Sequence, residues 1–376
     1  MKTPLSYIEL SKNNLIHNIK CLKSVAKKGT LFSVAIKGNA YGHGEKEIAK
    51  ILDPHVDYFQ VDSIEELRSL RKVSRKKVFV FGYVEKNDIR EAIKLGCILA
   101  PFSIREVKEI NKQAKILKTK QAIHIPVDAC LGREGFLKNE LGDLFLEIKK
   151  CQNIKVTGMY AHFANIEDTK HFTHAARQIK EYIAALKVAD DFNFKNLQTH
   201  ISATSGLLVY EKDKGYNNII RLGIGAYGLW PSEHIKDLYK NKIELKPVLA
   251  WKTKVAQIKI LPKGHSVGYG LTYITPRNVK VAIIPIGYAD GFDRGFSNNG
   301  EVLIGGTKCR ILGRVMMNMI VVDVSHIKNI KAEDEVVLLG KQGKREIKAE
   351  DLARRVGTIN YEITTRINPL LPRIVK

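Results

Sequence analysis

The sequence predicts an α/β barrel followed by a mainly β domain, and three observations support this. From residue 30 to about 225, short apolar runs alternate with amphipathic helical stretches, the pattern of parallel strands joined by crossover helices. After about Lys242, apolar residues recur at every second position, which is the periodicity of strands. No low-complexity linker lies between the two parts. We therefore expect tightly packed domains at residues 1–242 and 243–376, with the first residues able to pair with the second domain.

Eight candidate strands belong to the first domain. Amphipathic stretches between them predict helices, for example at Glu45–Leu52, Ser63–Lys72, Ile104–Lys115 and Arg177–Ala189. Eight strands with intervening helices favour a closed (β/α)8, TIM-like barrel, and a doubly wound open sheet is the alternative. The candidate strands are Leu31–Ile36, Tyr58–Val61, Val78–Phe81, Cys97–Ala100, Ala122–Val127, Val156–Tyr160, Leu197–Ser202 and Asn218–Leu222.

The second domain is predicted to consist of short strands separated by glycine-containing turns. Its clearest alternation of apolar and polar residues runs from Val248 to Ile260. One helix, Ala349–Val356, is expected to interrupt the strands. The further candidate strands are Val279–Ile284, Glu301–Ile304, Lys308–Leu312, Met319–Val324 and Glu335–Leu339.

Composition excludes several classes of protein. No run of about eighteen apolar residues could span a bilayer, and the N-terminus lacks the apolar core of a secretory signal, so we expect an intracellular, cytoplasmic protein without a membrane partner. Five scattered cysteines include no Cys-x-x-Cys pair, so we expect neither a metal site nor disulfides. The net charge of +23 comes from dispersed Lys and Arg residues, which indicates a solvated basic surface rather than a nucleic-acid partner.

Lys37 is the most informative residue of the first domain. It follows the apolar run Leu31–Ile36 and precedes a glycine-rich turn, which places it at the carboxyl end of a strand. In α/β folds ligands bind and catalytic residues gather at that end of the sheet. Apolar surroundings there would favour the neutral amine and so permit Schiff-base chemistry. Val34–Lys37 also spells a protein-kinase strand motif, but the other kinase motifs are absent from the sequence.

A second glycine-rich motif, Gly-x-Gly-x-x-Gly, spans residues 223–228. It follows the eighth strand rather than the first, which argues against a dinucleotide-binding fold. Barrels commonly hold a phosphate after their last strands, so the backbone amides of Gly223 and Ile224 are candidates for a phosphate cradle. Ser205, after the seventh strand, can add a hydroxyl group. The alternative is that these glycines only permit a tight turn.

The lysine and the cradle together suggest one cofactor, pyridoxal 5'-phosphate (PLP). The first and eighth strands of a closed barrel are neighbours, so both features lie close together. PLP needs a lysine for its aldehyde, a cradle for its phosphate and a partner for its ring nitrogen. Arg221, beside the cradle, is the candidate for the third role.

Across residues 6 to 368 the chain resembles the alanine racemase family, the two-domain type of the fold-type III PLP-dependent enzymes. The resemblance rests on ordered motifs in both predicted domains. These motifs are Ala35–Gly44, Gly132–Gly135, His162–Phe163, Arg221–Ile224, Gly268–Tyr273, Gly287–Gly291, Gly313–Met317 and Asn360–Glu362.

The resemblance implies a homodimer that interconverts L-alanine and D-alanine with two catalytic residues. Lys37 would serve one face of the substrate, and Tyr269 from a partner subunit would serve the other. A tyrosine that acts as a base must lose its proton near neutral pH, and His162 with Arg221 behind it resemble the residues that favour this by hydrogen bonding and positive charge. In a bacterium the product would supply D-alanine for cell-wall peptidoglycan.

The resemblance also assigns binding roles. Tyr41 and Tyr361 match hydroxyl groups that contact the cofactor phosphate. Arg133 matches the donor to the cofactor's phenolic oxygen and the substrate carboxylate, and the Met317 amide matches a further carboxylate contact. Tyr288 and Arg314 match entrance residues of the family.

Two positions depart from the family pattern. Many members carry a lysine, often carbamylated, where this chain has Pro126. Proline can be neither carbamylated nor a hydrogen-bond donor, so Arg133 must be held by another group or by a bound anion such as chloride. Asn318 stands where the family usually has aspartate, which removes a charge near the entrance.

Three alternatives stay open beside alanine racemisation. The first is a racemase of serine or of broad specificity, because the sequence does not display the pocket size that selects the side chain. Decarboxylation of a basic amino acid uses the same fold but fits Tyr269 and Arg221 less well. The remote alternative is a non-catalytic PLP-binding or regulatory protein, although single-domain PLP carriers lack the β domain.

Overall fold

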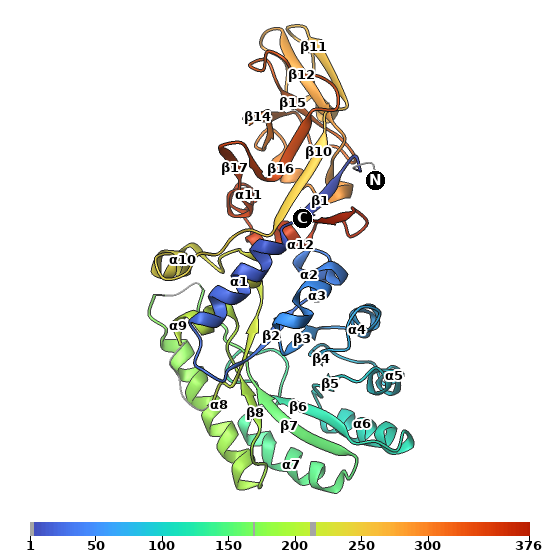
Figure 1. The fold of residues 1–376 in the computed structure, drawn as a ribbon, viewed down its shortest axis with the longest axis vertical. Helices are drawn as coiled ribbons and strands as arrows, with labels where there is room; N and C mark the ends of the chain where they lie inside the picture. The colour runs from blue at the N-terminus through green and yellow to red at the C-terminus, as the bar shows by residue number, and fades with distance from the viewer. Residues whose placement is uncertain (1–3, 168–169, 211–215) are drawn as a thin grey trace. The chain divides into compact units, whose positions relative to one another are not determined.

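The computed structural model describes residues 4–167, 170–210 and 216–376. The chain forms two compact units. The barrel unit comprises residues 16–37 and 48–245, and the β unit comprises the chain up to Leu15 together with residues 38–47 and 246–376. Segment 38–47 of the β unit directly follows Lys37, so the chain leaves the barrel unit at the residue that the sequence singled out. The helices and strands of both units are labelled in Figure 1.

In the described part of the barrel unit, eight parallel strands form one sheet in the order β8-β7-β6-β5-β4-β3-β2-β9. Two backbone hydrogen bonds close this sheet, from the amide of Asn218 to the carbonyl of Thr199 (2.8 Å) and from Arg221 to Ser202 (3.0 Å). They join the segments of β8 and β9, so the predicted barrel is confirmed. The strands are β2 (Leu31–Ala35), β3 (Tyr58–Val61), β4 (Lys77–Val80), β5 (Ile98–Leu99), β6 (Gln121–Pro126), β7 (Ile154–Tyr160), β8 (Gln198–His200) and β9 (Ile219–Leu222).

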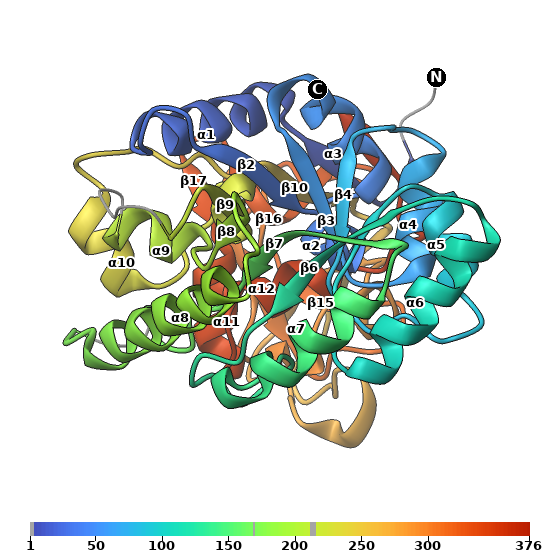
Figure 2. The same cartoon turned by 90° about the horizontal axis from the view of Figure 1, so that it is seen from below.

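Helices lie on the outside of these strands (Figure 2). Serines at strand ends start two of them, because Ser63 and Ser103 side chains accept hydrogen bonds from the amides of Glu66 and Glu106 (both 3.2 Å). The helices of this part of the chain are α1 (Lys12–Ser24), α3 (Glu45–Leu52), α4 (Ile64–Arg71), α5 (Ile89–Lys94), α6 (Ile104–Ile116), α7 (Leu141–Lys150), α8 (Thr173–Asp191), α9 (Thr204–Val209) and α10 (Glu233–Tyr239).

Aromatic side chains fill the barrel interior beneath the carboxyl ends of the strands. Phe79 stacks on Tyr58 with ring centroids 4.7 Å apart and on Phe81 at 5.0 Å. Tyr160 continues the stack, 4.4 Å from Phe81 and 5.2 Å from the ring of His200. Such pairs add roughly 0.5–1.5 kcal/mol each beyond the burial of apolar area. The barrel interior is therefore a packed core, and the site residues lie above this stack of aromatic rings.

In the β unit, the sheet has the order β11-β12-β15-β14-β13-β16-β10-β1-β18, with β17 paired to β16. The N-terminal strand β1 runs antiparallel to β10 and parallel to β18. The elements are β1 (Tyr7–Leu10), β10 (Leu249–Lys254), β11 (Gln257–Leu261), β12 (Val279–Ile284), β13 (Glu301–Ile304), β14 (Thr307–Leu312), β15 (Ile320–Asp323), β16 (Glu335–Gln342), β17 (Arg345–Ile347), α11 (Ala349–Val356), α12 (Asn360–Thr365) and β18 (Arg373–Val375).

The structure adds two details that the sequence pattern of this domain did not show. The run Val248–Ile260 is two strands, because the amides of Val255 and Ala256 donate to carbonyls outside the pair, at Asp334 and Ile283. A second helix, α12, follows α11, whereas the sequence pattern indicated one helix. At six residues α12 is too short to show helical periodicity.

A left-handed turn, α2 (Lys37–Tyr41), follows the first barrel strand. Gly38, Asn39 and Ala40 have φ angles of 60°, 53° and 54°, and Tyr41 has 53°. The next residue, Gly42, has φ 83°, and a Cβ atom there would lie 1.8 Å from the carbonyl oxygen of Thr364. Glycine is therefore required at position 42 for both backbone conformation and close packing.

Replacing Gly42 with alanine is expected to destabilise the protein by more than about 4 kcal/mol, because the methyl group meets a backbone atom that cannot move aside cheaply. Gly29 is a matched control, since it has φ 88° but no atom within 4 Å of the place where a methyl group would lie. Gly29→Ala is expected to cost only roughly 1–2 kcal/mol, the penalty for a positive φ angle. Urea unfolding of both variants measures the difference, and equal losses would contradict the packing argument.

Candidate active site

Lys37 lies directly beyond the end of β2, as predicted. Its Nζ donates a hydrogen bond to Oδ2 of Asp62 (3.2 Å), the residue that follows β3. The Lys37 side chain is 38% exposed, so its amine is accessible to a ligand. Sequence analysis missed Asp62, although its place directly after the neighbouring strand was an available signal.

His43 holds the turn that follows Lys37. Its Nδ1 lies 3.0 Å from the carbonyl oxygens of both Ala40 and Tyr41, so this nitrogen carries the proton and donates. Burial lowers the pKa of His43 to about 4, which keeps the ring neutral at physiological pH. Within the β unit, the ring of Tyr41 packs edge-on against Tyr361 with centroids 6.0 Å apart. The two tyrosines predicted to contact a phosphate therefore lie together.

Arg221, on β9, is a buried cation held mainly by histidines. Its Nη1 donates to Nδ1 of His200 (2.6 Å), and its Nη2 donates to Nδ1 of His162 (2.9 Å) and to the carbonyl of Ala161 (2.7 Å). The guanidinium carbon also lies 5.3 Å from the centre of the Tyr160 ring, a cation–π distance. Burial lowers the pKa of Arg221 to about 10, so it stays protonated at neutral pH.

This arrangement fixes the protons on three histidines. Arginine only donates hydrogen bonds, so Nδ1 of both His162 and His200 must accept and each neutral ring carries its proton on Nε2. Nε2 of His200 lies 2.8 Å from Nδ1 of His124 and therefore donates to it. Burial first, and the charge of Arg221 second, hold the pKa values of His162 and His200 well below their usual range. The same causes lower the pKa of His124 to about 3.

Residues of the predicted phosphate cradle lie at the ends of β8 and β9. The amides of Gly223 and Ile224 open the 3-10 turn Ile224–Tyr227, whose own hydrogen bonds do not use them. The Gly223 amide donates to Oγ1 of Thr204 (3.3 Å). A Cβ atom on Gly225 would lie 2.4 Å from Cγ2 of Thr204, so the loop has no room for a side chain there. To join a phosphate cradle with the Ile224 amide, the Gly223 amide would exchange this long hydrogen bond to Thr204 for one to the anion.

Ser205 donates its hydroxyl proton to Oε1 of Glu167 (2.5 Å). The hydroxyl would have to turn from this carboxylate to bind a phosphate, and it could do so by rotation about one side-chain bond. No sequence pattern pointed to Glu167, because the two residues are 38 positions apart.

Arg133 forms a bidentate pair with its neighbour Glu134. Nη2 of Arg133 donates to Oε1 of Glu134 (2.8 Å), and Nε donates to Oε2. The pair raises the pKa of Arg133. The charges of Arg133 and Lys37 also contribute to the low pKa of His162, which places these basic groups at the same end of the barrel as Arg221. Sequence analysis predicted Arg133 and missed Glu134.

The remaining candidates, Tyr269 and Met317, line a cavity of about 430 Å³ in the β unit. Tyr269 begins a 3-10 turn rather than lying in a strand, and its side chain is 74% exposed. The same cavity is lined by the predicted entrance residues Tyr288 and Arg314 and by Asn318, which departs from the family pattern. Residues from three separate predicted motifs therefore meet at one place.

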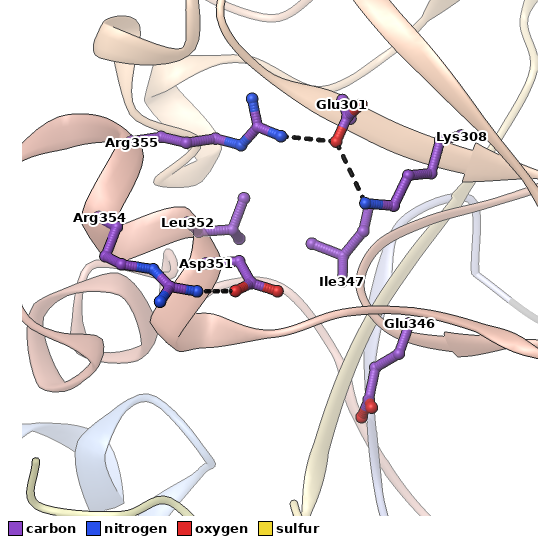
Figure 3. A pocket seen from close by; sticks show the side chains of 8 residues that line it. All are labelled: Glu301, Lys308, Glu346, Ile347, Asp351, Leu352, Arg354 and Arg355. Atoms are coloured by element: carbon purple, nitrogen blue, oxygen red, sulfur yellow. Dashed lines mark hydrogen bonds and ion pairs between the residues drawn. The ribbon is translucent and has the colours of Figure 1, made fainter. Parts of the chain in front are cut away.

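A second cavity of the β unit, about 390 Å³, contains none of the candidate catalytic residues (Figure 3). Its charged side chains pair with one another: Glu301 accepts from both Arg355 (2.6 Å) and Lys308 (3.4 Å). Asp351 pairs with Arg354 in the same way. With Glu346, three acidic and three basic side chains line the cavity, so it has no net charge that would favour an ionic ligand.

Neither a metal cluster nor a membrane span is found in the described part of the chain. Within residues 4–167, 170–210 and 216–376, no three His, Cys, Asp or Glu side chains are arranged to hold a metal ion. None of the helices that the structure describes is long and apolar enough to cross a membrane.

The model of the family "Alanine racemase, N-terminal domain" matches residues 10–231, and that of "Alanine racemase, C-terminal domain" matches residues 248–375. The chain belongs to the alanine racemase family. This family is PLP-dependent, and its members are isomerases that provide D-alanine for peptidoglycan. The predicted family, fold class and enzyme class are therefore confirmed.

Individual relatives agree with this assignment. An alanine racemase of Leptospira interrogans is 32% identical over 98% of this chain and 95% of its own length. The solved structure of an alanine racemase from Clostridium difficile 630 is 31% identical, with a TM-score of 0.93 over 100% of this chain and 97% of that one. A histidine racemase from Leuconostoc mesenteroides is 26% identical, with a TM-score of 0.89 over 100% and 99% of the two chains.

Replacing Arg221 with glutamine is expected to raise the pKa of His162, because a neighbouring positive charge is removed while the ring stays buried. Imidazole titration by NMR of histidine-labelled protein measures this change. Arg71→Gln is the matched control, since Arg71 is a buried arginine of the same unit whose partners are backbone carbonyls such as Leu95 and Gly96. A His162 titration curve that does not move in Arg221→Gln would show that the arginine does not govern this ring.

Proposed function

We propose that this chain racemises alanine with PLP bound through Lys37. The observation that carries the proposal is the buried Arg221, which donates to two neutral imidazoles at the barrel end where the Lys37 amine is accessible. An accessible amine, an open glycine-rich backbone and a buried donor fit the three needs of PLP: an attachment point, a phosphate cradle and a partner for the ring nitrogen. When bound, PLP makes the Cα proton of an amino acid removable.

Arg221 explains why racemisation is favoured over other reactions of this cofactor. Its pKa of about 10 leaves it protonated at neutral pH, so it can donate a hydrogen bond to a ring nitrogen without readily giving up the proton. With Arg221 as its partner, a bound cofactor would take less negative charge into its ring, which would favour return of the proton to Cα. An acidic residue in this place would favour transamination more.

Two bases act on opposite faces of the substrate in this proposal. Nζ of Lys37 removes or returns the proton on one face, and Oη of Tyr269 does so on the other. Nε2 of His162 carries a proton that it can donate to the phenolate oxygen of Tyr269, while Arg221 holds the histidine in that tautomer. Proton transfer in either direction leaves each base in the form needed for the reverse reaction.

We propose that Tyr269 acts in the site of a partner subunit of a homodimer. Its exposure supports this, because a catalytic side chain that is 74% exposed needs a further surface to exclude water. Other large apolar side chains of the same segments are also exposed, which is typical of an interface. They are Leu271, Ile274, Met317 and Met319.

The binding roles follow from chemistry and the family resemblance. We assign the cofactor phosphate to hydroxyl groups of Tyr41, Tyr361 and Ser205 and to the amides of Gly223 and Ile224. Arg133 and the Met317 amide would bind the substrate carboxylate. The proposed division at residues 242 and 243 gives the barrel domain the cofactor and the β domain the second base.

We further propose a cytoplasmic enzyme, because the amino-acid substrate and PLP are both available there. The side chain of the substrate is the least constrained part, since the histidine racemase shares this fold with a TM-score of 0.89. A serine or broad-specificity racemase is therefore the second candidate, and initial rates with L-alanine and L-serine separate the two. A chain that binds PLP without turnover of either would be a non-catalytic PLP-binding protein.

Replacing Tyr269 with phenylalanine is expected to lower kcat at least a hundredfold while the visible absorption band of bound cofactor stays, because only one base is lost. The loss should differ between the L-to-D and D-to-L directions when Cα deuterium exchange is followed. Tyr239→Phe is the control, since this tyrosine lies on α10 and its ring contact with Lys242 survives the change. Unchanged rates in both directions for Tyr269→Phe would remove Tyr269 from the mechanism.

A further inference from the structure

The pairing of Arg133 with Glu134 is unusual because the two residues are adjacent in sequence. Side chains of consecutive residues in regular structure point in different directions, so they seldom meet. Here two hydrogen bonds join them edge to edge, the geometry in which arginine binds a carboxylate most strongly. Glu134 is only 21% exposed, whereas Arg133 is 54% exposed. The carboxylate thus lies behind the guanidinium, and the guanidinium reaches toward solvent.

The loop that carries the pair is closed by its own hydrogen bonds. The amide of Phe136 donates to the carbonyl of Pro126, and the amide of Asp128 donates to the carbonyl of Phe136 (both 3.0 Å). Oδ1 of Asp128 accepts from the amides of Leu131 (2.8 Å) and Gly132 (2.9 Å). These bonds fix both ends of the loop without a ligand.

Gly135 gives the loop the shape that brings the two side chains together. It has φ 123°, and a Cβ atom there would lie 2.8 Å from the Asp128 amide nitrogen. Only glycine fits this position, so the chain can turn sharply directly after Glu134. The Arg133–Glu134 pair is therefore a built feature of the loop rather than a chance contact of two long side chains.

The negative charge of Glu134 lies among several positively charged side chains at this end of the barrel. Arg133, Arg221 and Lys37 all act on His162, so positive charges gather there. Glu134 supplies a negative charge at Arg133, as Asp62 does at Lys37. Its charge also contributes, after burial, to raising the pKa of Tyr160 beneath the site.

We propose that Glu134 is the positioning residue that holds Arg133 for the substrate carboxylate and makes an external anion unnecessary in this enzyme. The inference rests on the proposed function. Glu134 accepts from Nε and from one proton of Nη2, which leaves the other Nη2 proton and both Nη1 protons for the ligand. Position 126, at the end of β6, is proline, which can supply neither a charge nor a hydrogen-bond donor to this arginine. The negative charge is instead supplied from the loop itself.

A bound chloride would compete for the same edge of Arg133. The Glu134 carboxylate makes two parallel hydrogen bonds to Arg133, and these are stronger than the hydrogen bonds that a spherical ion accepts. The carboxylate is also tethered covalently one residue away, which raises its effective concentration at the arginine. Racemisation by the native enzyme should therefore be indifferent to chloride, and removal of the carboxylate should create an anion site.

The test compares the native holoenzyme with Glu134→Gln in chloride and in gluconate at equal ionic strength. The native KM for L-alanine is expected to be the same in both salts. In gluconate, Glu134→Gln should raise KM roughly tenfold to a hundredfold, the value of a charge-assisted hydrogen bond, with a smaller change in kcat. Chloride should lower that KM again. Glu134→Asp keeps the charge and should respond little to chloride.

A second readout does not depend on turnover. Chloride is expected to raise the Tm of cofactor-free Glu134→Gln but not that of the cofactor-free native protein or of Glu147→Gln, a control glutamate on α7 that pairs with Lys150. A native enzyme whose KM depends on chloride, or a Glu134→Gln variant with native KM in gluconate, would overturn the role of Glu134. Absence of racemisation by the native protein in both salts would instead contradict the proposed function.

Discussion

A buried arginine that can only donate hydrogen bonds determines the protonation of the barrel interior. Arg221 joins the carboxyl ends of β7, β8 and β9 through the Ala161 carbonyl and two imidazoles. Its backbone amide also makes one of the two hydrogen bonds that close the barrel. Arg221 therefore contacts the strand that closes the sheet, two neutral histidines and the Tyr160 ring beneath them. A group able to accept a hydrogen bond at this place would leave the histidine tautomers undetermined.

Periodicity was sufficient to predict most of the fold. Val279–Ile284, Glu301–Ile304 and Ala349–Val356 have the predicted ends, because apolar spacing changes sharply at both ends of each element. The predicted run Val248–Ile260 continues its alternation through a break, because a strand that changes partner keeps its side-chain period. Short elements such as α12 contain too few residues for any period to be visible.

Site residues could be predicted where their position relative to a strand end decides their role. Lys37 follows a strand, and Gly223 and Ile224 open a turn after another, so both could be inferred from position alone. Asp62 could have been inferred in the same way, since it directly follows β3. Glu167 could not, because it lies 38 positions from Ser205 and meets it only in the folded barrel. Glu134 is a different case, since it is adjacent to Arg133 and only the unusual loop backbone turns the two side chains together.

The left-handed turn after Lys37 has a consequence for how that lysine moves. Five consecutive residues, 38–42, have positive φ angles, and His43 donates to two of their carbonyl groups. A backbone so constrained cannot yield when the amine changes partner. All travel of the amine nitrogen must come from rotation about the four carbon–carbon bonds of the side chain. Lys37 is therefore a flexible side chain on a fixed backbone. The length of that side chain, rather than any bending of the backbone, limits where its proton can be delivered.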